Sequence, residues 1–328
     1  MTISMVLCNP STQPIINVPC NGPKLINAKQ KEKVVLVMGA TGTGKSRLSI
    51  DLGTCFPSEI INSDKIQAYE GLEIATNKVT KEEQRGVPHH LLGIHNPYSE
   101  FTANDFCDMA SLAMESIIGR EQLPIIVGGS NSYVEALVER FGSRYDWFFL
   151  WLDVSMPVLH SYVSRRVDEM VEKGMVNELR PFFSPNGDYT KGIRKAIGVP
   201  EFDMFFRSEA TTWDERRKQR LFDEAISGVK KNTCTLACKQ FERIERLRNV
   251  KRWNMQRVCA TRVFEMHGNG DDDEADEAWR KIVAEPSARL VAQFLYNEAI
   301  NNNNNNYSGI SSRASVPCLS PTLMMVKI

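Results

Sequence analysis

Apolar and polar positions follow two different periods along the first half of the chain. Short apolar runs rich in β-branched residues, typical of buried parallel strands, occur at 33–38, 59–62, 90–94, 123–128 and 147–153. Longer segments between them, at 45–53, 102–119 and 131–139, suit helices with one apolar face. This alternation predicts an α/β core over residues 33–156, in which helices cover both faces of a parallel sheet.

The second half of the chain has mainly helical periodicity. Two apolar stripes recur at helical spacing: Val163, Val167, Met170 and Val171 form one, and Leu221, Ala225, Ile226 and Val229 the other. We expect residues 157–255 to be a helical part that completes the functional site. Residues 256–328 should hold a C-terminal helix, marked by Leu290, Val291, Phe294 and Leu295, and a tail. The acidic run at 271–277 and the run Asn301–Asn306 should be solvated loop or tail.

One loop between a predicted strand and a predicted helix carries a complete phosphate-binding motif. Residues 39–46 read GATGTGKS, which matches G-x-x-x-x-G-K-[ST] in the strand–loop–helix context that the motif requires. Glycines let successive backbone N–H groups converge, the helix N-terminus adds partial positive charge, and the lysine adds a full charge. The final serine hydroxyl can hold Mg²⁺. A P-loop NTPase-like fold is therefore expected, with a di- or triphosphate bound by Gly39, Ala40, Thr41, Gly42, Thr43, Gly44, Lys45 and Ser46.

Two further segments should reach the same edge of the sheet, because ligands of open α/β sheets bind at the carboxyl ends of strands. Ser63 and Asp64 follow the second predicted strand, and a glycine pair follows the run at 123–127. Three roles are open to Asp64: a metal partner, a general base, or a cap of the following turn. An NTPase usually holds its metal with an aspartate at the end of an apolar strand. Here the run at 123–127 ends in glycines, which disfavours ATP hydrolysis.

Composition excludes several classes of protein. The 328 residues include 40 basic and 40 acidic side chains, so general affinity for nucleic acid is not implied. No apolar run approaches the roughly 20 residues that span a bilayer. Eight cysteines without a C-x-x-C pair argue against a zinc module and for a reducing compartment. Residues 1–32 should form a flexible leader, and its acid-poor first 30 residues leave a transit peptide and a plain tail equally open.

The order of motifs along residues 33 to 252 resembles the isopentenyltransferase family. After GATGTGKS come SDKIQAYEGLEIATNK, PHHLLGIHNP, FTANDF and VGGSNSY, and later RRVDEMVEKGMVNEL, IRKAIGVPEF and NTCTLACKQ. Members of this family transfer a prenyl group from dimethylallyl diphosphate to the N6 amine of adenine. Some modify adenine-37 of tRNA, and others modify free AMP, ADP or ATP to make cytokinin precursors. The resemblance therefore implies a prenyltransferase.

The resemblance also reassigns the phosphate loop. In this family the loop holds the diphosphate of the prenyl donor, which is the leaving group, and the adenine nucleotide is the acceptor. Asp64 then matches the base that takes a proton from the amine, and Thr41 matches a residue whose hydroxyl contacts that amine. Lys45 and Mg²⁺ would stabilise the departing diphosphate. The other substrate-binding residues that the resemblance implies are Ser63, Arg166, Arg194 and Lys239.

Two groups of basic residues have a functional and a structural interpretation. Residues 230–252 carry eight basic and two acidic side chains, a net charge of +6. They could form a lid that gathers phosphates or a charged surface helix. His89 and His90 lack metal-ligand spacing to a cysteine or a further histidine, so we expect them to flank a strand.

Departures from the tRNA-modifying members favour a small acceptor. Bacterial tRNA enzymes of this family carry a long helical insertion after the VGG segment, whereas here Ser130 leads through one predicted helix to the strand at Trp147. They also have Thr-Arg where this chain has Thr233-Cys234, and the Cys/His spacing of the zinc finger that eukaryotic tRNA members add does not occur in this sequence. The resemblance is therefore to plant-type adenylate isopentenyltransferases.

That resemblance implies a set of substrates and surroundings. We expect dimethylallyl diphosphate and an adenine nucleotide as substrates, Mg²⁺ as cofactor, and a monomer with neither nucleic-acid nor membrane partners. We expect a plastid location, with the cytoplasm as the alternative. The alternative functions are a tRNA adenine-37 dimethylallyltransferase and a P-loop small-molecule kinase.

Overall fold

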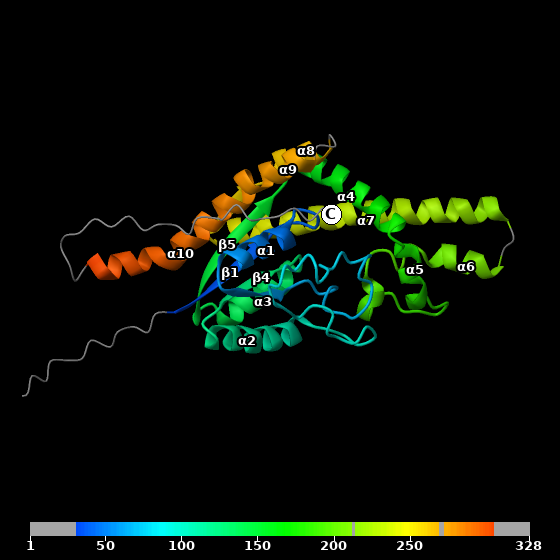
Figure 1. Cartoon of the computed structure of the whole chain (residues 1–328). Helices are drawn as coiled ribbons and strands as arrows, with labels where there is room; N and C mark the ends of the chain where they lie inside the picture. Colours follow the sequence, from blue (N-terminus) through cyan, green and yellow to red (C-terminus); the bar gives the residue numbers. More distant parts are fainter. Residues whose placement is uncertain (1–30, 212–213, 269–271, 305–328) are drawn as a thin grey trace, which may run out of the picture. The chain divides into compact units, whose positions relative to one another are not determined.

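The fold belongs to one of two units into which the chain divides. These units are Met1–Lys31 and Glu32–Ile328. A computed structural model describes residues 31–211, 214–268 and 272–304 (Figure 1). The predicted leader, apart from its last two residues, and the end of the asparagine run lie outside the described residues.

A six-stranded sheet forms the centre of the fold. Its strands are β1 (Glu32–Met38), β2 (Ser58–Asn62), β3 (His89–His90), β4 (Leu123–Val127), β5 (Tyr145–Asp153) and β6 (Met255–Cys259). They pair in the order β3-β2-β4-β1-β5-β6, and every pair is parallel. Val35 on the central strand lies opposite Ile125 on one side and Phe148 on the other. The predicted parallel α/β sheet is therefore confirmed.

Helices connect the strands and extend beyond them. They are α1 (Lys45–Cys55), α2 (Ala103–Gly119), α3 (Asn131–Phe141), α4 (Met156–Glu172), α5 (Met175–Leu179), α6 (Asp203–Thr211), α7 (Glu215–Asn249), α8 (Thr261–Gly268), α9 (Asp272–Trp279) and α10 (Glu285–Asn304). Short 3₁₀ turns, η1 (Arg180–Phe182) and η2 (Gly192–Lys195), and a π-helical turn, η3 (Arg280–Ala284), lie between them. Within the described ranges, no helix combines the length and apolar character needed to cross a membrane.

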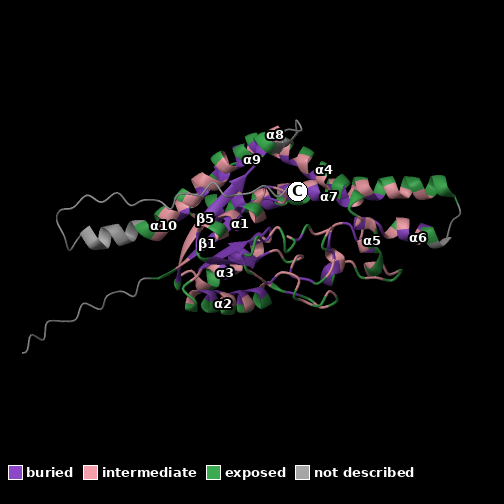
Figure 2. Ribbon diagram, in the orientation of Figure 1, coloured by how far each residue is buried: buried purple, intermediate pink, exposed green. Residues whose placement is uncertain are grey.

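Two hydrophobic cores lie on opposite faces of the sheet, as the period of two in a strand requires. On β1, Val34 and Leu36 face one core, and Val35 and Val37 face the other. Helices α2, α3 and most of the apolar stripe of α7 cover the first core. Helices α1, α8 and α10 cover the second. Buried residues accordingly concentrate on the central strands (Figure 2).

The strand predicted at 90–94 is wrong in its extent. Only His89 and His90 form β3, so the two histidines make up the strand instead of flanking it. The chain cannot stay extended after them, because Leu91 and Gly93 have φ angles of 60° and 62°. His90 Nε2 lies 2.6 Å from Oε2 of Glu59, a contact that ties this short strand to β2.

The C-terminal part differs from the sequence-based expectation in two ways. Strand β6 was not predicted, because Val258 is its only buried residue and the run lacks an apolar pattern. Its Arg257 pairs with the carboxylate of Asp153, the aspartate that ends β5. The acidic run expected as loop forms helix α9 from Asp272 onward, and α10 takes in the start of the asparagine run.

The predicted C-terminal helix is present as α10 and packs on the second core. Val291 of α10 is fully buried in the second core, and Leu290, Phe294 and Leu295 pack against that core. The ring of Phe294 also stacks on Phe148 of β5, with 5.0 Å between the ring centres. Helix α10 is therefore anchored on the same face of the sheet as α1.

Candidate active site

The phosphate loop joins β1 to α1 in a conformation that strongly favours glycine at two positions. Gly42 and Gly44 have φ angles of 83° and 86°. A Cβ added at Gly42 would lie 2.5 Å from Cγ1 of Val163, so the tip of the loop is in close contact with α4. Inside the loop, the Thr43 hydroxyl and the Lys45 ammonium both donate to the carbonyl of Ala40, at 2.9 and 2.6 Å.

Lys45 lies in an unusual electrostatic setting. Its side chain keeps some contact with solvent, but the protein surrounding it lowers its pKa from an ordinary value of 10.5 to about 8. The nearby carboxylate of Asp64 opposes this shift, and the guanidinium of Arg166 adds to it. Two cations and one carboxylate from three separate elements therefore meet beside the loop.

Asp64 holds the turn after β2 with one of its two oxygens. Its Oδ1 accepts hydrogen bonds from the N–H groups of Ile66 and Gln67, at 2.9 and 3.4 Å. The structural role considered from the sequence is therefore real. Oδ2 lies on the side of Gly129, 3.2 Å from where a Cβ of that residue would be, and has no hydrogen bond within the described chain. One carboxylate oxygen thus remains for a ligand.

Thr41 links the loop to two helices. Its hydroxyl accepts a hydrogen bond from Nη2 of Arg166 on α4, at 3.1 Å. Its backbone N–H donates to Oε1 of Gln240 on α7, at 2.7 Å. The structure thus brings Thr41, Lys45, Asp64 and Arg166 together, by direct hydrogen bonds or electrostatic influence.

Buried polar atoms without partners surround this group. Within the described residues, Oγ of Ser63, Nε of Arg166 and Oδ1 of Asn131 have no hydrogen-bond partner. Buried polar atoms in native proteins are nearly always satisfied by protein, water or ligand. A polar ligand bound beside the loop could form hydrogen bonds with these three atoms.

Gln240 is a site residue that the sequence interpretation missed. Besides its bond to Thr41, its Nε2 donates to the carbonyl of Gly129 at 2.9 Å, and Asn131 Nδ2 donates to its backbone carbonyl at 3.0 Å. The side chain therefore ties the phosphate loop to the glycine pair after β4. A signal was present: this glutamine interrupts the buried stripe of α7 formed by Thr233, Ala237, Ile244 and Leu247.

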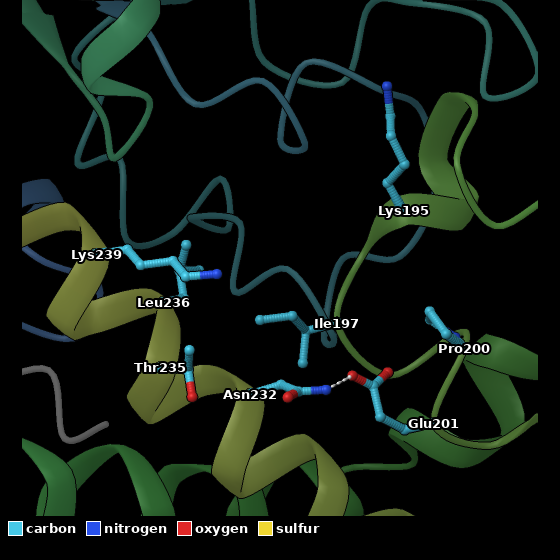
Figure 3. A pocket seen from close by; sticks show the side chains of 8 residues that line it. All are labelled: Lys195, Ile197, Pro200, Glu201, Asn232, Thr235, Leu236 and Lys239. Carbon is cyan, nitrogen blue, oxygen red and sulfur yellow. Dashed lines mark hydrogen bonds between the residues drawn. The ribbon is translucent and has the colours of Figure 1, made fainter.

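Lys239 and Arg194 lie apart from the loop contacts described above. Lys239 lines a pocket of about 300 Å³ together with Lys195 and six other residues (Figure 3). Those six are Ile197, Pro200, Glu201, Asn232, Thr235 and Leu236. The side chain of Arg194 has a different environment, since its Nε donates to the carbonyl of Phe182 and its guanidinium lies over the ring of Tyr98. No pocket-lining residue belongs to the phosphate loop, but Lys239 directly precedes Gln240.

The net charge of residues 230–252 has mainly a structural explanation. Arg243 and Arg246 both form ion pairs with the largely buried carboxylate of Glu135 on α3. Lys230 pairs with Asp168 on α4. These three pairs make part of the stretch a charged helix face that holds α7 against α3 and α4, whereas Lys239 lines a pocket.

The metal-binding capacity of the site depends on the loop. Within the described ranges, no group of three histidine, cysteine or acidic side chains could hold a metal ion. The hydroxyl of Ser46, in the first turn of α1, makes no hydrogen bond to the described chain and is free to bind one. Together with the free oxygen of Asp64, it forms an all-oxygen donor set, which suits Mg²⁺ when phosphate oxygens complete the shell.

Comparisons with known proteins agree with one another. The model of the IPP transferase family matches residues 67–144 and 139–249. Adenylate isopentenyltransferase 3, chloroplastic, from Arabidopsis thaliana is 53% identical over 307 residues, which cover 90% of each chain. Adenylate isopentenyltransferase 7, mitochondrial, from the same plant is 50% identical over 84% of this chain and 82% of that protein. A solved eukaryotic dimethylallyltransferase acting on tRNA has a similar fold, with 22% identity and a TM-score of 0.67 over 81% of this chain and 80% of that one.

Proposed function

This chain belongs to the IPP transferase family, and from that premise we propose that it transfers a dimethylallyl group to the N6 amine of an adenine nucleotide. Its donor is dimethylallyl diphosphate, and diphosphate is released. The reaction is the first step of cytokinin synthesis. The observation that carries this proposal is a phosphate loop whose lysine lies within the electrostatic reach of the Asp64 carboxylate.

The donor diphosphate is assigned to the loop. Backbone N–H groups of the loop, the N-terminus of α1 and the Lys45 ammonium all favour an anion at this point. Their effect grows during the reaction, because negative charge accumulates on the diphosphate as its bond to C1 breaks. Mg²⁺, held by the Ser46 hydroxyl and by phosphate oxygens, would add further positive charge beside this leaving group.

The acceptor amine is assigned to the side of Asp64. The N6 nitrogen attacks C1 of the prenyl group, the C1–O bond breaks, and its electron pair leaves with the diphosphate. Because the lone pair of N6 is delocalised into the adenine ring, removal of an N6 proton as the new bond forms assists the attack. The unpartnered Oδ2 of Asp64 takes that proton, while Oδ1 remains bound to the turn and keeps the carboxylate oriented.

Arg166 and Thr41 complete the arrangement. Arg166 donates to the Thr41 hydroxyl, which leaves the hydroxyl proton available for a substrate atom. The Nε of Arg166 has no partner within the described chain and is a second donor toward bound phosphate. Arg166 and Thr41 therefore offer hydrogen-bond donors between the site proposed for the donor diphosphate and the site proposed for the acceptor amine.

The pocket beside α7 is assigned to the phosphates of the acceptor. Lys195 and Lys239 both line it; in Figure 3 they lie on opposite sides of the pocket, and the amino group of Lys195 points away from the other lining side chains. Lys195 also pairs with Glu100 at 2.9 Å, so an incoming phosphate would compete with that carboxylate. A small nucleotide as acceptor fits this arrangement, and ATP or ADP would use the pocket more fully than AMP.

Two observations support a free nucleotide over tRNA. Only residues 142–144 separate α3 from β5, where bacterial tRNA-modifying members would carry their insertion. Relatives that are 50% and 53% identical over most of the chain are named adenylate isopentenyltransferases, whereas the solved enzyme that acts on tRNA is 22% identical. Those two relatives are named chloroplastic and mitochondrial, and a plastid is the location that we propose for this chain.

An acceptor panel tests the proposal. The purified protein would be incubated with Mg²⁺, dimethylallyl diphosphate and one acceptor at a time: AMP, ADP, ATP or an anticodon stem-loop RNA. Parallel reactions would omit the dimethylallyl diphosphate. Mass spectrometry should detect N6-isopentenyl product with free nucleotides, at rates above those with the RNA. A faster reaction with RNA would favour the tRNA enzyme, and phosphate transfer without any prenyl donor would favour a kinase.

A further inference from the structure

A tryptophan from the C-terminal part of the chain lies against the phosphate loop. Trp279 ends α9, beyond residue 249, where the match to the family model stops. A Cβ added at Gly44 would lie only 2.6 Å from Cη2 and 2.8 Å from Cζ3 of its indole ring. Gly44 is the residue before the loop lysine and the N-cap of α1. The indole thus fills the space directly behind the end of the loop.

Contacts with α1 hold the indole on two further sides. The guanidinium of Arg47 lies 4.6 Å from the centre of the ring, and the indole N–H donates to Oδ2 of Asp51 at 2.8 Å. Arg47 also pairs with Asp276, one turn earlier on α9, at 2.9 Å. Only 3% of the surface of Trp279 remains exposed. One side chain therefore connects the end of the loop, the first turn of α1 and α9.

The helix changes its geometry immediately after this residue. Residues Arg280–Ala284 form a π-helical turn, in which the N–H of Glu285 donates to the carbonyl of Arg280. π-Helical turns are rare and occur often at functional sites. The change in winding separates α9, which contacts the loop helix, from α10, which is anchored in the second core through Val291. With this turn between them, Val291 can be buried in the second core while Trp279 contacts the phosphate loop.

We propose that Trp279 is a positioning residue for the phosphate loop, through which the C-terminal helices hold the loop in the conformation that binds the donor diphosphate. The inference rests on the proposed donor site at this loop. Backbone N–H groups bind an anion strongly only when they already converge on it, since ordering them on binding weakens affinity. A loop without the indole behind Gly44 would lose that preorganisation.

Two variants at this position separate the functions of the ring. Trp279→Phe keeps an aromatic ring but removes the N–H donor and the outer indole atoms Cη2 and Cζ3 that lie behind Gly44, while Asp51 keeps its ion pair with Arg85. Trp279→Leu removes the flat surface that contacts the loop. Arg47→Gln provides a third variant outside the core, because it removes the stacking partner and the pair with Asp276 without creating a cavity.

Trp253 offers a matched control. It lies between α7 and β6, is partly buried where Trp279 is buried, and stacks on Phe149 of β5, with 4.7 Å between the ring centres; it has no contact with the loop among the described interactions. Trp253→Leu should therefore reduce stability by a similar mechanism. A purely structural role for Trp279 would make the two leucine variants behave alike.

The measurement is the Kd of inorganic diphosphate with Mg²⁺, by calorimetry, together with the KM of each substrate. We expect Trp279→Leu to weaken diphosphate about ten- to a hundredfold, as misplacement of binding groups does. The KM of dimethylallyl diphosphate should rise in parallel and the KM of the nucleotide should stay within about twofold. Trp279→Phe should weaken diphosphate less than Trp279→Leu does, because a smaller flat ring remains behind the loop.

The outcomes decide the proposal in each case. If folded Trp279→Leu binds diphosphate as the unaltered protein does, or if Trp253→Leu weakens it equally, the positioning role is wrong. If Trp279→Leu does not fold, Arg47→Gln decides: a diphosphate Kd raised at least twofold supports the role, and an unchanged Kd overturns it. Failure of the unaltered protein to prenylate any nucleotide would refute the proposed function, while the diphosphate titration would still test Trp279.

Discussion

The two sides of the candidate site are built in different ways. The proposed donor side is a run of eight consecutive residues, 39–46, whose turns depend on local glycines and the start of α1 and which contacts from α7 and α9 support. The acceptor side combines Asp64 after β2 with Lys195 and Lys239, which come from distant parts of the chain. The phosphate site is therefore local in sequence, whereas the acceptor site depends on the packing of α7 against the sheet. Variants should separate the two sides by their effects on binding and on turnover.

The largest effect is expected at the junction of the two sides. Asp64→Ala should lower kcat by about 10²- to 10⁴-fold, the usual contribution of a general base. The Kd of dimethylallyl diphosphate should stay close to its original value, because the carboxylate acts on the acceptor. Single-turnover kinetics and calorimetry would check both parts. If the variant instead loses Mg²⁺ affinity and donor binding together, Asp64 is a metal ligand.

Loss of the loop lysine should affect donor binding and turnover together. Lys45→Ala removes the full positive charge beside the departing diphosphate, and we expect kcat to fall by about 10²- to 10³-fold. The donor should also bind more weakly, which distinguishes this variant from Asp64→Ala. A variant with unchanged donor affinity would show that the diphosphate does not lie on the loop.

Gln240 tests whether the two sides depend on each other. Gln240→Leu leaves the N–H of Thr41 and the carbonyl of Gly129 without their partner, and each such loss costs about 1–3 kcal/mol. We expect a lower melting temperature and a donor KM raised by about ten- to thirtyfold. Gln240→Glu is the matched control, since it keeps an acceptor for Thr41 but not a donor for Gly129. Normal donor binding in both variants would show that the loop is held without α7.

The pH dependence of donor binding should reveal the charge of Lys45. Its pKa of about 8 in the folded protein means that the ammonium is present below pH 8 and is lost as the pH rises through that value. Diphosphate affinity should therefore fall by up to about tenfold per pH unit above pH 8. Lys45→Ala should remove this dependence. Titration calorimetry from pH 6.5 to 9.5 would detect either result, and an affinity that stays constant in the unaltered protein contradicts the lowered pKa.

The same pKa shift has an opposite consequence for stability. In the unfolded chain Lys45 titrates near 10.5, so between pH 8 and pH 10.5 the unfolded state binds more protons than the folded state. The contribution of this residue to the free energy of unfolding therefore increases with pH over that range. Comparing the unaltered protein with Lys45→Ala in denaturant titrations at both ends of the range isolates this contribution.

The smallest effect is expected at the acceptor pocket. Lys239 is exposed, and exposed ion pairs contribute about 0.2–1 kcal/mol, so Lys239→Ala should raise the KM of ATP or ADP by no more than about fivefold. The KM of the donor should not change. Adenosine, which has no phosphate, should respond to the variant least of all. Equal changes for ATP and adenosine would remove the acceptor phosphates from this pocket.

The sequence predicted the parts of the fold that are encoded locally. Strand β1, the loop with Lys45 and helix α1 follow from neighbouring residues, and so do the helices whose apolar stripes the sequence displays. Strand β6 escaped notice because an edge strand with one buried residue has no clear period. The strand expected at 90–94 ended early because Leu91 adopts a left-handed conformation, which its identity does not predict.

Contacts between distant segments account for what the sequence did not predict at the site. Gln240 and Trp279 approach the loop only because α7 and α9 pack beside it; the basic residues around Gln240 do not single out the glutamine, and no phosphate-binding motif surrounds Trp279. Arg194 stays a predicted substrate-binding residue, and its partners in the structure are the Phe182 carbonyl and the ring of Tyr98. A polar or bulky residue within a buried stripe is the one sequence signal that could find such positions.

A crystal structure with a non-reactive thiolo analogue of dimethylallyl diphosphate, ADP and Mg²⁺ tests the central claim most directly. We predict the analogue's diphosphate within hydrogen-bond distance of the loop N–H groups and of Lys45, and the N6 amine of adenine beside Oδ2 of Asp64. If the β-phosphate of ADP occupies the loop instead, with its adenine away from Asp64, the assignment of donor and acceptor is wrong.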